Sequence, residues 1–204
     1  MDGPGTLTWE EFILNAKSLV RVSNEISDSW ELRGDEEVPG QAYLCRSVKT
    51  FVSSDLAAAL GGENRRENLG NLDDVDDPFE AKRVEDSPMC VEHHILWSMS
   101  YGVPVLYFNA WISDFPGVNA VTVESIQNLA QQGVGYNELS QAVHPILGTI
   151  FLQFHPCLSR ELIQNTSKSN NKLISWLSTV APSALNLKLR GEYFNLTLEE
   201  SSIS

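Results

Sequence analysis

The sequence FLQFHPC, residues 151–157, begins as an apolar run and ends in one of the three cysteines of the chain. Pro156 has no backbone N–H to donate to a β-ladder, so strand pairing is expected to stop at or near His155. Cys157 is therefore expected at a strand exit, beside a helix-forming sequence. Such a position favours an exposed and somewhat acidic thiol, although most cysteines are buried. Two interpretations are open at this point: a small apolar residue that closes a strand, or a thiol presented for chemistry.

The sequence before this stretch predicts β-structure around one hairpin. Two β-rich runs, HHILWSMS (93–100) and VPVLYFNAWI (103–112), are joined around Tyr101-Gly102, as is typical of a hairpin turn. Residues 42–52, AYLCRSVKTFV, alternate in polarity and predict a further strand. Residues 143–157 are expected to form a turn followed by another buried strand, which ends at the His-Pro-Cys.

Helices are predicted before and after these strands. From Thr8 to about Ser29 apolar residues recur at spacings of three and four, and Thr8 with Glu11 forms a capping-box pattern. A short helix is expected from Thr122, where Ser125 gives a weaker second capping pattern. The sequence Gly133-x-Gly135 is expected to end that helix.

The sequence after Cys157 also has helical character. Residues 158–167 and 170–186 are predicted helices, and Pro182 is expected to bend or end the second. The last dozen residues, from about Glu192, are expected to be frayed. Residues 61–88 are rich in aspartate and glutamate, which predicts a solvated loop or a disordered insert with no binding role.

The order of these elements predicts the fold class. A helix, then strands, then helices occur in blocks, which favours an α+β fold with a central antiparallel meander. A length of 204 residues suits one sizeable domain. We expect a single domain over residues 1–204, with a core at about 8–190, the acidic insert at about 61–88 and a tail at about 192–204.

The composition narrows the classes of function. The formal net charge of −13 argues against binding to nucleic acid or to anionic membranes, which need basic surfaces. The N-terminus lacks the basic start and apolar block of a secretory signal, and the apolar stretches are too short to span a bilayer. Three cysteines are too few for a secreted disulfide scaffold, so a reduced, cytoplasmic protein is expected.

The same residues allow other chemistries to be considered, a cysteine protease, a zinc site and a phosphate loop. A cysteine protease would need a histidine base, and neither His144 nor any other histidine has a spacing that selects it. His155 is expected to hold the turn through backbone hydrogen bonds. A zinc site built from Cys90, His93, His94 and the His155/Cys157 pair lacks a second half with ordinary zinc spacing. Gly133-x-Gly135 has no lysine and no preceding strand, which excludes a phosphate loop.

Three blocks of sequence resemble a known family. They are SMSYGVPVLYFNAW, HPILGTIFLQFHPC and ISWLSTVAPSALNL, in that order, and Ser29–Glu31 and Tyr43–Cys45 are also similar to the N-terminal region of the family. Over roughly residues 9–188, excluding the acidic insert, the chain resembles the autophagy-related protein ten family. These proteins are ubiquitin-conjugating-type enzymes. The His-Pro-Cys of the family falls on His155, Pro156 and Cys157.

The resemblance implies a fold, an activity and partners. It implies a ubiquitin-conjugating-enzyme-like core in which Cys157 is the catalytic nucleophile. Such an enzyme accepts the ubiquitin-like autophagy protein twelve from the activating enzyme, autophagy protein seven, and transfers it to a lysine of autophagy protein five. No cofactor is implied. The related autophagy protein three family also carries His-Pro-Cys, but it modifies a lipid and its chains are longer; the Ser175–Ser178 block favours the protein-ten family.

Two features stay open in the sequence. Ordinary conjugating enzymes use an asparagine of a His-Pro-Asn to stabilise the oxyanion, and here cysteine takes its place. Asn137, Asn109 and Tyr107 are candidates for that role, and the sequence does not select among them. We also expect the strand from Val103 to Ile112 to pack in the core and to lie at a sheet edge, and we hypothesise that the hairpin to which it belongs recognises the acceptor protein. A non-catalytic adaptor with the same fold is the alternative function.

Overall fold

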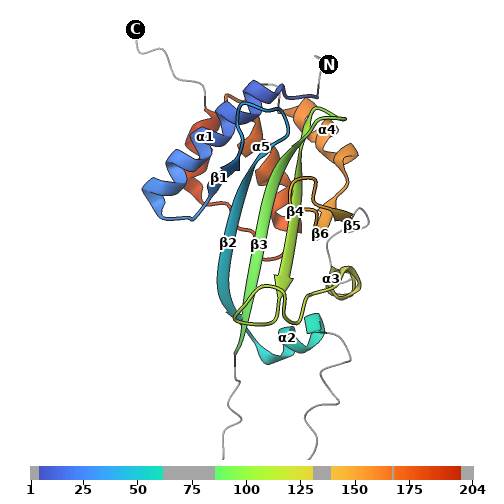
Figure 1. Ribbon diagram of the computed structural model, residues 1–204. Coiled ribbons are helices and arrows are strands. Elements are labelled where there is room, and N and C mark those ends of the chain that lie inside the picture. The colour runs from blue at the N-terminus through green and yellow to red at the C-terminus, as the bar shows by residue number, and fades with distance from the viewer. Residues whose placement is uncertain (1–4, 62–85, 131–138, 167, 199–204) are drawn as a thin grey trace, which may run out of the picture.

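The computed structural model describes residues 5–61, 86–130, 139–166 and 168–198 (Figure 1). Their strands form one antiparallel sheet in the order β1-β2-β3-β4-β6-β5. The strands are β1 (Glu31–Gly34), β2 (Ala42–Val52), β3 (Ser87–Ser98), β4 (Val103–Trp111), β5 (Leu139–Val143) and β6 (Ile150–Phe154). The helices are α1 (Trp9–Ile26), α2 (Ser54–Gly61), α3 (Val123–Ala130), α4 (Pro156–Asn165) and α5 (Lys172–Val180), with 3-10 helices η2 (Ala181–Ser183) and η3 (Gly191–Thr197). The α+β class and the antiparallel meander are confirmed.

The helices α1 and α5 cover one face of the sheet (Figure 1). The main core lies between these helices and the sheet. Its fully buried members include Phe12, Leu44, Ile95, Phe108 and Trp176. Among the described residues, no helix combines the length and the apolar character needed to cross a bilayer.

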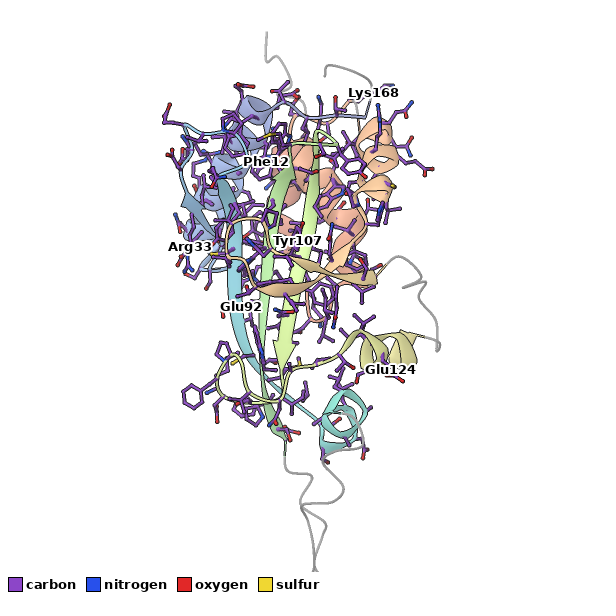
Figure 2. All side chains as sticks on the ribbon, turned by 45° about the vertical axis from the view of Figure 1, so that its right-hand side comes forward. Phe12, Arg33, Glu92, Tyr107, Glu124 and Lys168 are labelled. Atoms are coloured by element: carbon purple, nitrogen blue, oxygen red, sulfur yellow. The ribbon has the colours of Figure 1, made fainter. Side chains whose placement is uncertain are left out.

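The opposite face, which we call the open face, carries a smaller apolar cluster. Its members are Tyr43, Cys45, Leu96, Val103, Val105, Tyr107 and Phe151. Successive residues of a strand point to opposite faces, so β2, β3 and β4 supply one core with alternate residues and this cluster with the others. Ile146, in the connection between β5 and β6, packs against the cluster. Figure 2 shows β5 and β6 crossing this face beside Tyr107.

Helix α1 begins as the sequence predicts. The Thr8 hydroxyl accepts a hydrogen bond from the Glu11 backbone N–H at 3.1 Å, and the Thr8 N–H donates to the Glu11 carboxylate at 2.9 Å. This reciprocal pair is a capping box, which satisfies two backbone donors at the helix start. The helix ends at Ile26, three residues before the predicted end, because Ser27 takes a left-handed conformation with φ of 56°.

Two strand predictions need correction. Neither β1 nor β5 was predicted, since both are short and exposed at most positions. The strand β4 is not at a sheet edge: it pairs with β3 on one side and with β6 on the other, through Tyr107–Gln153 and Phe108–Leu152. The hairpin β5–β6 folds back against β4, so the edges of the sheet are β1 and β5. The expectation that β4 lies at a sheet edge is therefore wrong. Recognition of the acceptor by the β3–β4 hairpin stays a prediction.

The ends of the predicted acidic insert, residues 61–88, belong to regular elements of the fold. Gly61 closes α2, a helix that the sequence analysis did not predict, and Ser87-Pro88 open β3. Residues 62–85 lie outside the described residues. Helix α3 begins after Thr122, whose hydroxyl accepts from the Ser125 N–H as the second capping pattern predicts. Its predicted end at Gly133-x-Gly135 also lies outside the described residues.

The prediction that the C-terminal segment frays from Glu192 is wrong. The segment packs on the face of the sheet that the helices cover. Pro182 does end the last α-helix as expected, since α5 stops at Val180. The 3-10 helix η3 then buries Tyr193 completely, and its hydroxyl donates to Asp28 at 2.8 Å. Arg46 donates to the other oxygen of the same carboxylate, also at 2.8 Å. Asp28, 3% exposed, therefore anchors the C-terminal segment to the start of the sheet.

The Tyr193–Asp28 contact predicts a stability effect. Tyr193→Phe is expected to lower the free energy of unfolding by about 2 kcal/mol, because a buried carboxylate loses a hydrogen-bond donor that water cannot replace. Chemical denaturation measures this loss, with Tyr101→Phe, a change at a 41% exposed ring, as the control. Equal stability of the Tyr193→Phe variant and the wild-type protein would show that the contact contributes nothing.

Candidate active site around Cys157

The His-Pro-Cys sequence forms the junction between β6 and α4. The strand β6 ends at Phe154, and His155 is the N-cap of α4, with φ of −62° and ψ of 132°. Pro156 occupies the first helical position, where a fixed φ suits the helix and no N–H is needed. Cys157 thus lies after the strand exit, as the sequence predicts. It also lies inside the first turn of α4, because the helix begins two residues earlier than expected.

The His155 side chain shapes this junction. Its Nδ1 atom accepts a hydrogen bond from the backbone N–H of Cys157 at 3.2 Å. This confirms the expected role of His155 in holding the turn. The Nδ1 lone pair is engaged, so in the neutral ring the hydrogen lies on Nε2, which points away from that bond. The bond makes His155 a helix cap, a role that differs from that of a protease base.

Cys157 is the exposed cysteine of the three. Cys45 and Cys90 are 5% and 6% exposed and belong to the open face. Burial raises the pKa of the Cys45 thiol to about 11, and the neighbouring carboxylates of Glu31 and Glu92 act in the same direction. The Cys90 thiol donates to the backbone carbonyl of Asp114 at 3.3 Å. Nucleophilic thiol chemistry requires an accessible sulfur, which Cys157 alone of the three provides.

The turn between β3 and β4 lies beside His155, the residue that caps α4. The ring of Tyr101 lies with its centroid 6.5 Å from that of His155, in an edge-on orientation of 71°. Met99, in the same turn, is 63% exposed. Tyr101 was predicted as a turn residue, and its position beside His155 was not predicted. An aromatic residue in a turn, where polar residues predominate, was the available signal.

The candidate oxyanion groups do not meet at Cys157. Tyr107 pairs with Gln153 in the register of the sheet and is buried on the open face, where burial raises its pKa. The Asn109 side-chain amide donates to the carbonyl of Ile150 at 2.9 Å, near the start of β6. Cys157 follows the opposite end of that strand. Asn137 lies outside the described residues.

The structure separates the residues of the alternative zinc site. Cys90 and His94 face the open face, whereas His93 points into the main core and its Nε2 donates to the carbonyl of Leu185 at 2.8 Å. His94 Nδ1 is hydrogen-bonded to His144 Nε2 at 3.1 Å, at a position on β3 that is distant from the His155 junction. In the part of the chain that the structure describes, no three metal-ligating side chains come together. The zinc interpretation is wrong for these residues.

The buried histidines also lack contact with the candidate site. His144 accepts hydrogen bonds at Nδ1 from the N–H groups of Ile146 and Leu147, and its Nε2 faces His94. Burial lowers the pKa of both His94 and His144. These contacts fasten the β5–β6 connection to the open face, which is a structural role.

Comparisons with known proteins point to one family. A family model described as "Autophagocytosis associated protein, active-site domain" matches residues 11–188, a range that includes the whole sheet and Cys157. The chain is 29% identical over 189 residues to "Ubiquitin-like-conjugating enzyme ATG10" of Homo sapiens, covering 83% of this chain and 85% of that protein. The chain is 32% identical over 116 residues to the ATG10 enzyme of Dictyostelium discoideum, covering 47% of this chain and 50% of that protein. It is 26% identical over 122 residues to the ATG10 enzyme of Arabidopsis thaliana, covering 52% of this chain and 53% of that protein. The resemblance drawn from the sequence blocks is confirmed.

Proposed function

We propose, from the premise that this chain belongs to the family of autophagocytosis associated proteins with an active-site domain, that Cys157 carries a ubiquitin-like modifier as a thioester. The family match and the ATG10 relatives make the chain a ubiquitin-like-conjugating enzyme, a transferase of the autophagy pathway. The observation that carries the proposal for Cys157 is its exposure in the first turn of α4, while the other two cysteines are buried.

The proposed modifier, donor and acceptor are those implied by the family resemblance. The modifier is autophagy protein twelve, the donor is autophagy protein seven and the acceptor is a lysine of autophagy protein five. The reaction supports autophagosome formation and takes place in the cytoplasm. The activating enzyme consumes the nucleotide, so the chain itself requires no cofactor for the two transfers.

The first step is an exchange between two thiols. The Cys157 sulfur attacks the thioester carbonyl on the activating enzyme, a new carbon–sulfur bond forms, and the leaving cysteine takes up the proton that Cys157 loses. Because the nucleophile and the leaving group are both thiols, this step needs little driving force. A cysteine is an intrinsically strong nucleophile even as a minor thiolate fraction.

The second step is more demanding. The lysine nitrogen attacks the thioester carbon, the bond to Cys157 breaks, and the sulfur regains a proton as the isopeptide forms. A lysine with an ordinary pKa near 10.4 is almost fully protonated at pH 7, and exposing its free amine costs roughly 4 to 5 kcal/mol. The enzyme therefore has to orient the amine and stabilise the tetrahedral oxyanion.

The start of α4 offers the positive end of its dipole to the proposed oxyanion. The N–H groups of Cys157 and Leu158 are already bonded to His155, to its Nδ1 and to its carbonyl, so the proposed stabilisation comes from the helix dipole. His155 holds the N–H of Cys157 and Pro156 fixes the turn, so the helix start is rigid where negative charge would develop. The ring of Tyr101 forms an apolar wall that excludes water from one side of the thioester. His155 and Tyr101 act as positioning residues in this scheme.

Reconstitution from purified components tests the proposed specificity. With autophagy protein seven, nucleotide, autophagy protein twelve and autophagy protein five, this chain is expected to form a reductant-sensitive adduct. A reductant-resistant conjugate of proteins twelve and five is expected to follow. The control replaces protein twelve and its acceptor by the modifier of the autophagy protein three system and lipid vesicles, and should give no lipid conjugate.

The alternative functions give different results in this assay. A non-catalytic adaptor forms no adduct and tolerates loss of the Cys157 thiol. An enzyme of the protein-three type forms the lipid conjugate instead. Either result would overturn the proposed transfer from protein twelve to protein five.

A further inference from the structure

The segment before α1 is attached to the β3–β4 hairpin. The backbone N–H of Leu7 donates to the carbonyl of Gly102 at 2.7 Å, and the indole Nε1 of Trp97 donates to the carbonyl of Leu7 at 2.9 Å. The Leu7 side chain is 2% exposed and belongs to the main core. We call residues 5–7 the N-terminal strap. One end of the strap is therefore fixed to the hairpin that carries Tyr101.

The other end of the strap contacts α4. Gly5 is buried and has φ of +90°, and a Cβ atom at this position would lie 2.7 Å from the backbone carbonyl oxygen of Arg160 and 3.3 Å from the Cβ of Gln164. Arg160 and Gln164 follow Cys157 by three and seven residues, a spacing that places all three on one face of a helix. The strap thus lies on the face of α4 that carries the nucleophile, one turn further along.

The approach at the hairpin is also close. Gly102 has φ of +62°, and a Cβ atom there would lie 3.4 Å from the Cβ of Thr6. Tyr101, the next residue in the chain, is the one whose ring faces His155. The strap therefore touches both walls of the candidate active site, the helix with the thiol and the turn with the aromatic ring.

We propose that the N-terminal strap is a positioning element of the transfer reaction, which sets the spacing between the first turn of α4 and the β3–β4 turn. This rests on the proposed function, because it takes Cys157 as the nucleophile. A shift of α4 relative to the turn moves the thioester, together with His155 that caps the same helix, away from Tyr101. Misplacement by about 1 Å can lower the rate of a positioned reaction by about a hundredfold.

A pair of glycine variants isolates the contact between the strap and α4. Gly5→Ala forces a Cβ against the Arg160 carbonyl, whereas Gly117→Ala places one where nothing lies within 4 Å. The two glycines have nearly the same φ, +90° and +89°, so the strain that depends on a positive φ is matched in the two variants. Only the first pushes on α4.

The readout is the single-turnover discharge of the preformed Cys157 thioester to free lysine. Only folded molecules become loaded, so a loss of stability alone does not change this rate. Gly5→Ala is expected to discharge about tenfold more slowly than Gly117→Ala. Alkylation of Cys157 by iodoacetamide is expected to be equally fast in both variants, since the thiol stays exposed. Equal discharge rates in the two variants would overturn the proposal.

A second pair of variants applies if Gly5→Ala does not fold. Trp97→Phe removes the indole donor to Leu7, and Trp9→Phe removes a matching indole bond, from Trp9 Nε1 to the carbonyl of Glu36 at 3.0 Å. The two rings pack against each other at 5.6 Å, so the change in packing is similar. Discharge is expected to fall several-fold only in Trp97→Phe; the same rate in both variants would contradict a positioning role.

The wild-type protein separates this proposal from the proposed function. If wild-type Cys157 forms no thioester, the function fails and the strap proposal fails with it. If wild-type protein loads and discharges normally and the matched variants do not differ, only the strap proposal fails.

Discussion

Cys157→Ser is expected to abolish the reductant-sensitive adduct between this chain and its modifier. Serine lacks the sulfur that forms the thioester, and removal of a covalent nucleophile elsewhere costs up to about a millionfold in rate. We therefore expect transfer to lysine to fall by at least about a thousandfold. The serine oxygen is expected to hold some modifier as an ester, which resists reductant and is cleaved by hydroxide. Non-reducing gels, run with and without reductant, distinguish the two adducts.

The other two cysteines are the matched controls for this experiment. Cys45→Ser and Cys90→Ser change residues that are 5% and 6% exposed on the open face, where an incoming thioester has no access. Both variants are expected to load at the wild-type rate while they stay folded, as circular dichroism would verify. A reductant-sensitive adduct on Cys157→Ser would show that Cys157 is not the nucleophile. Loss of that adduct in a folded Cys45→Ser or Cys90→Ser variant would contradict the assignment as well.

The elements that the sequence predicted well are those set by local physics. The strand at residues 42–52 has the predicted bounds, and its side chains alternate between half-buried and exposed from Arg46 to Phe51, as the period of a strand requires. The capping box of α1 depends on residues three apart, and the end of β6 depends on one proline. For the same reason the exposure of Cys157 and the capping role of His155 could be predicted: both follow from three consecutive residues at a strand exit.

The elements that the sequence could not predict depend on distant partners. Tyr193 is buried because its hydroxyl meets Asp28, 165 residues earlier, and no local pattern near residue 193 contains that information. The same holds for β5, whose pairing with β6 inserts a hairpin beside β4 and removes the expected sheet edge. Tyr101 was missed because its neighbour His155 is close only in the folded chain. Thus the exposed thiol could be predicted from sequence, whereas the aromatic neighbour of the His155 junction could not.

His93 makes one of these long-range contacts, and its burial is expected to make the stability of the protein depend on pH. His93 is fully buried in the main core, donates from Nε2 to the Leu185 carbonyl, and leaves its Nδ1 without a hydrogen-bond partner. Protonation would place a charge and an unpaired donor beside Arg46, its neighbour across the strands. Burial is the largest cause that lowers the pKa of His93, to about 4, and the positive charge of Arg46 acts in the same direction.

We expect His93 to make the protein progressively less stable below pH 6.5. The unfolded chain binds a proton at this residue with a pKa near 6.5, and the folded chain does so only near 4, so the unfolded state carries more protons between these values. Unfolding free energy therefore rises with pH in this window. The contribution is complete above pH 6.5 and falls by roughly 3 kcal/mol as the pH drops to 4. Denaturant titrations at several pH values measure the slope.

The variant His93→Gln separates this effect from the acid response of the carboxylates, which both proteins share. It is expected to be less stable than wild type at pH 7, because the core loses a fitted ring, and the difference should shrink by roughly 3 kcal/mol on acidification to pH 4. A constant difference across the window would mean that His93 takes up its proton equally easily in both states. In that case burial against Leu185 and Arg46 would not be the cause that keeps the His93 ring neutral. The packing of η2 and the following segment against β3 would then have to open in acid before the whole protein unfolds.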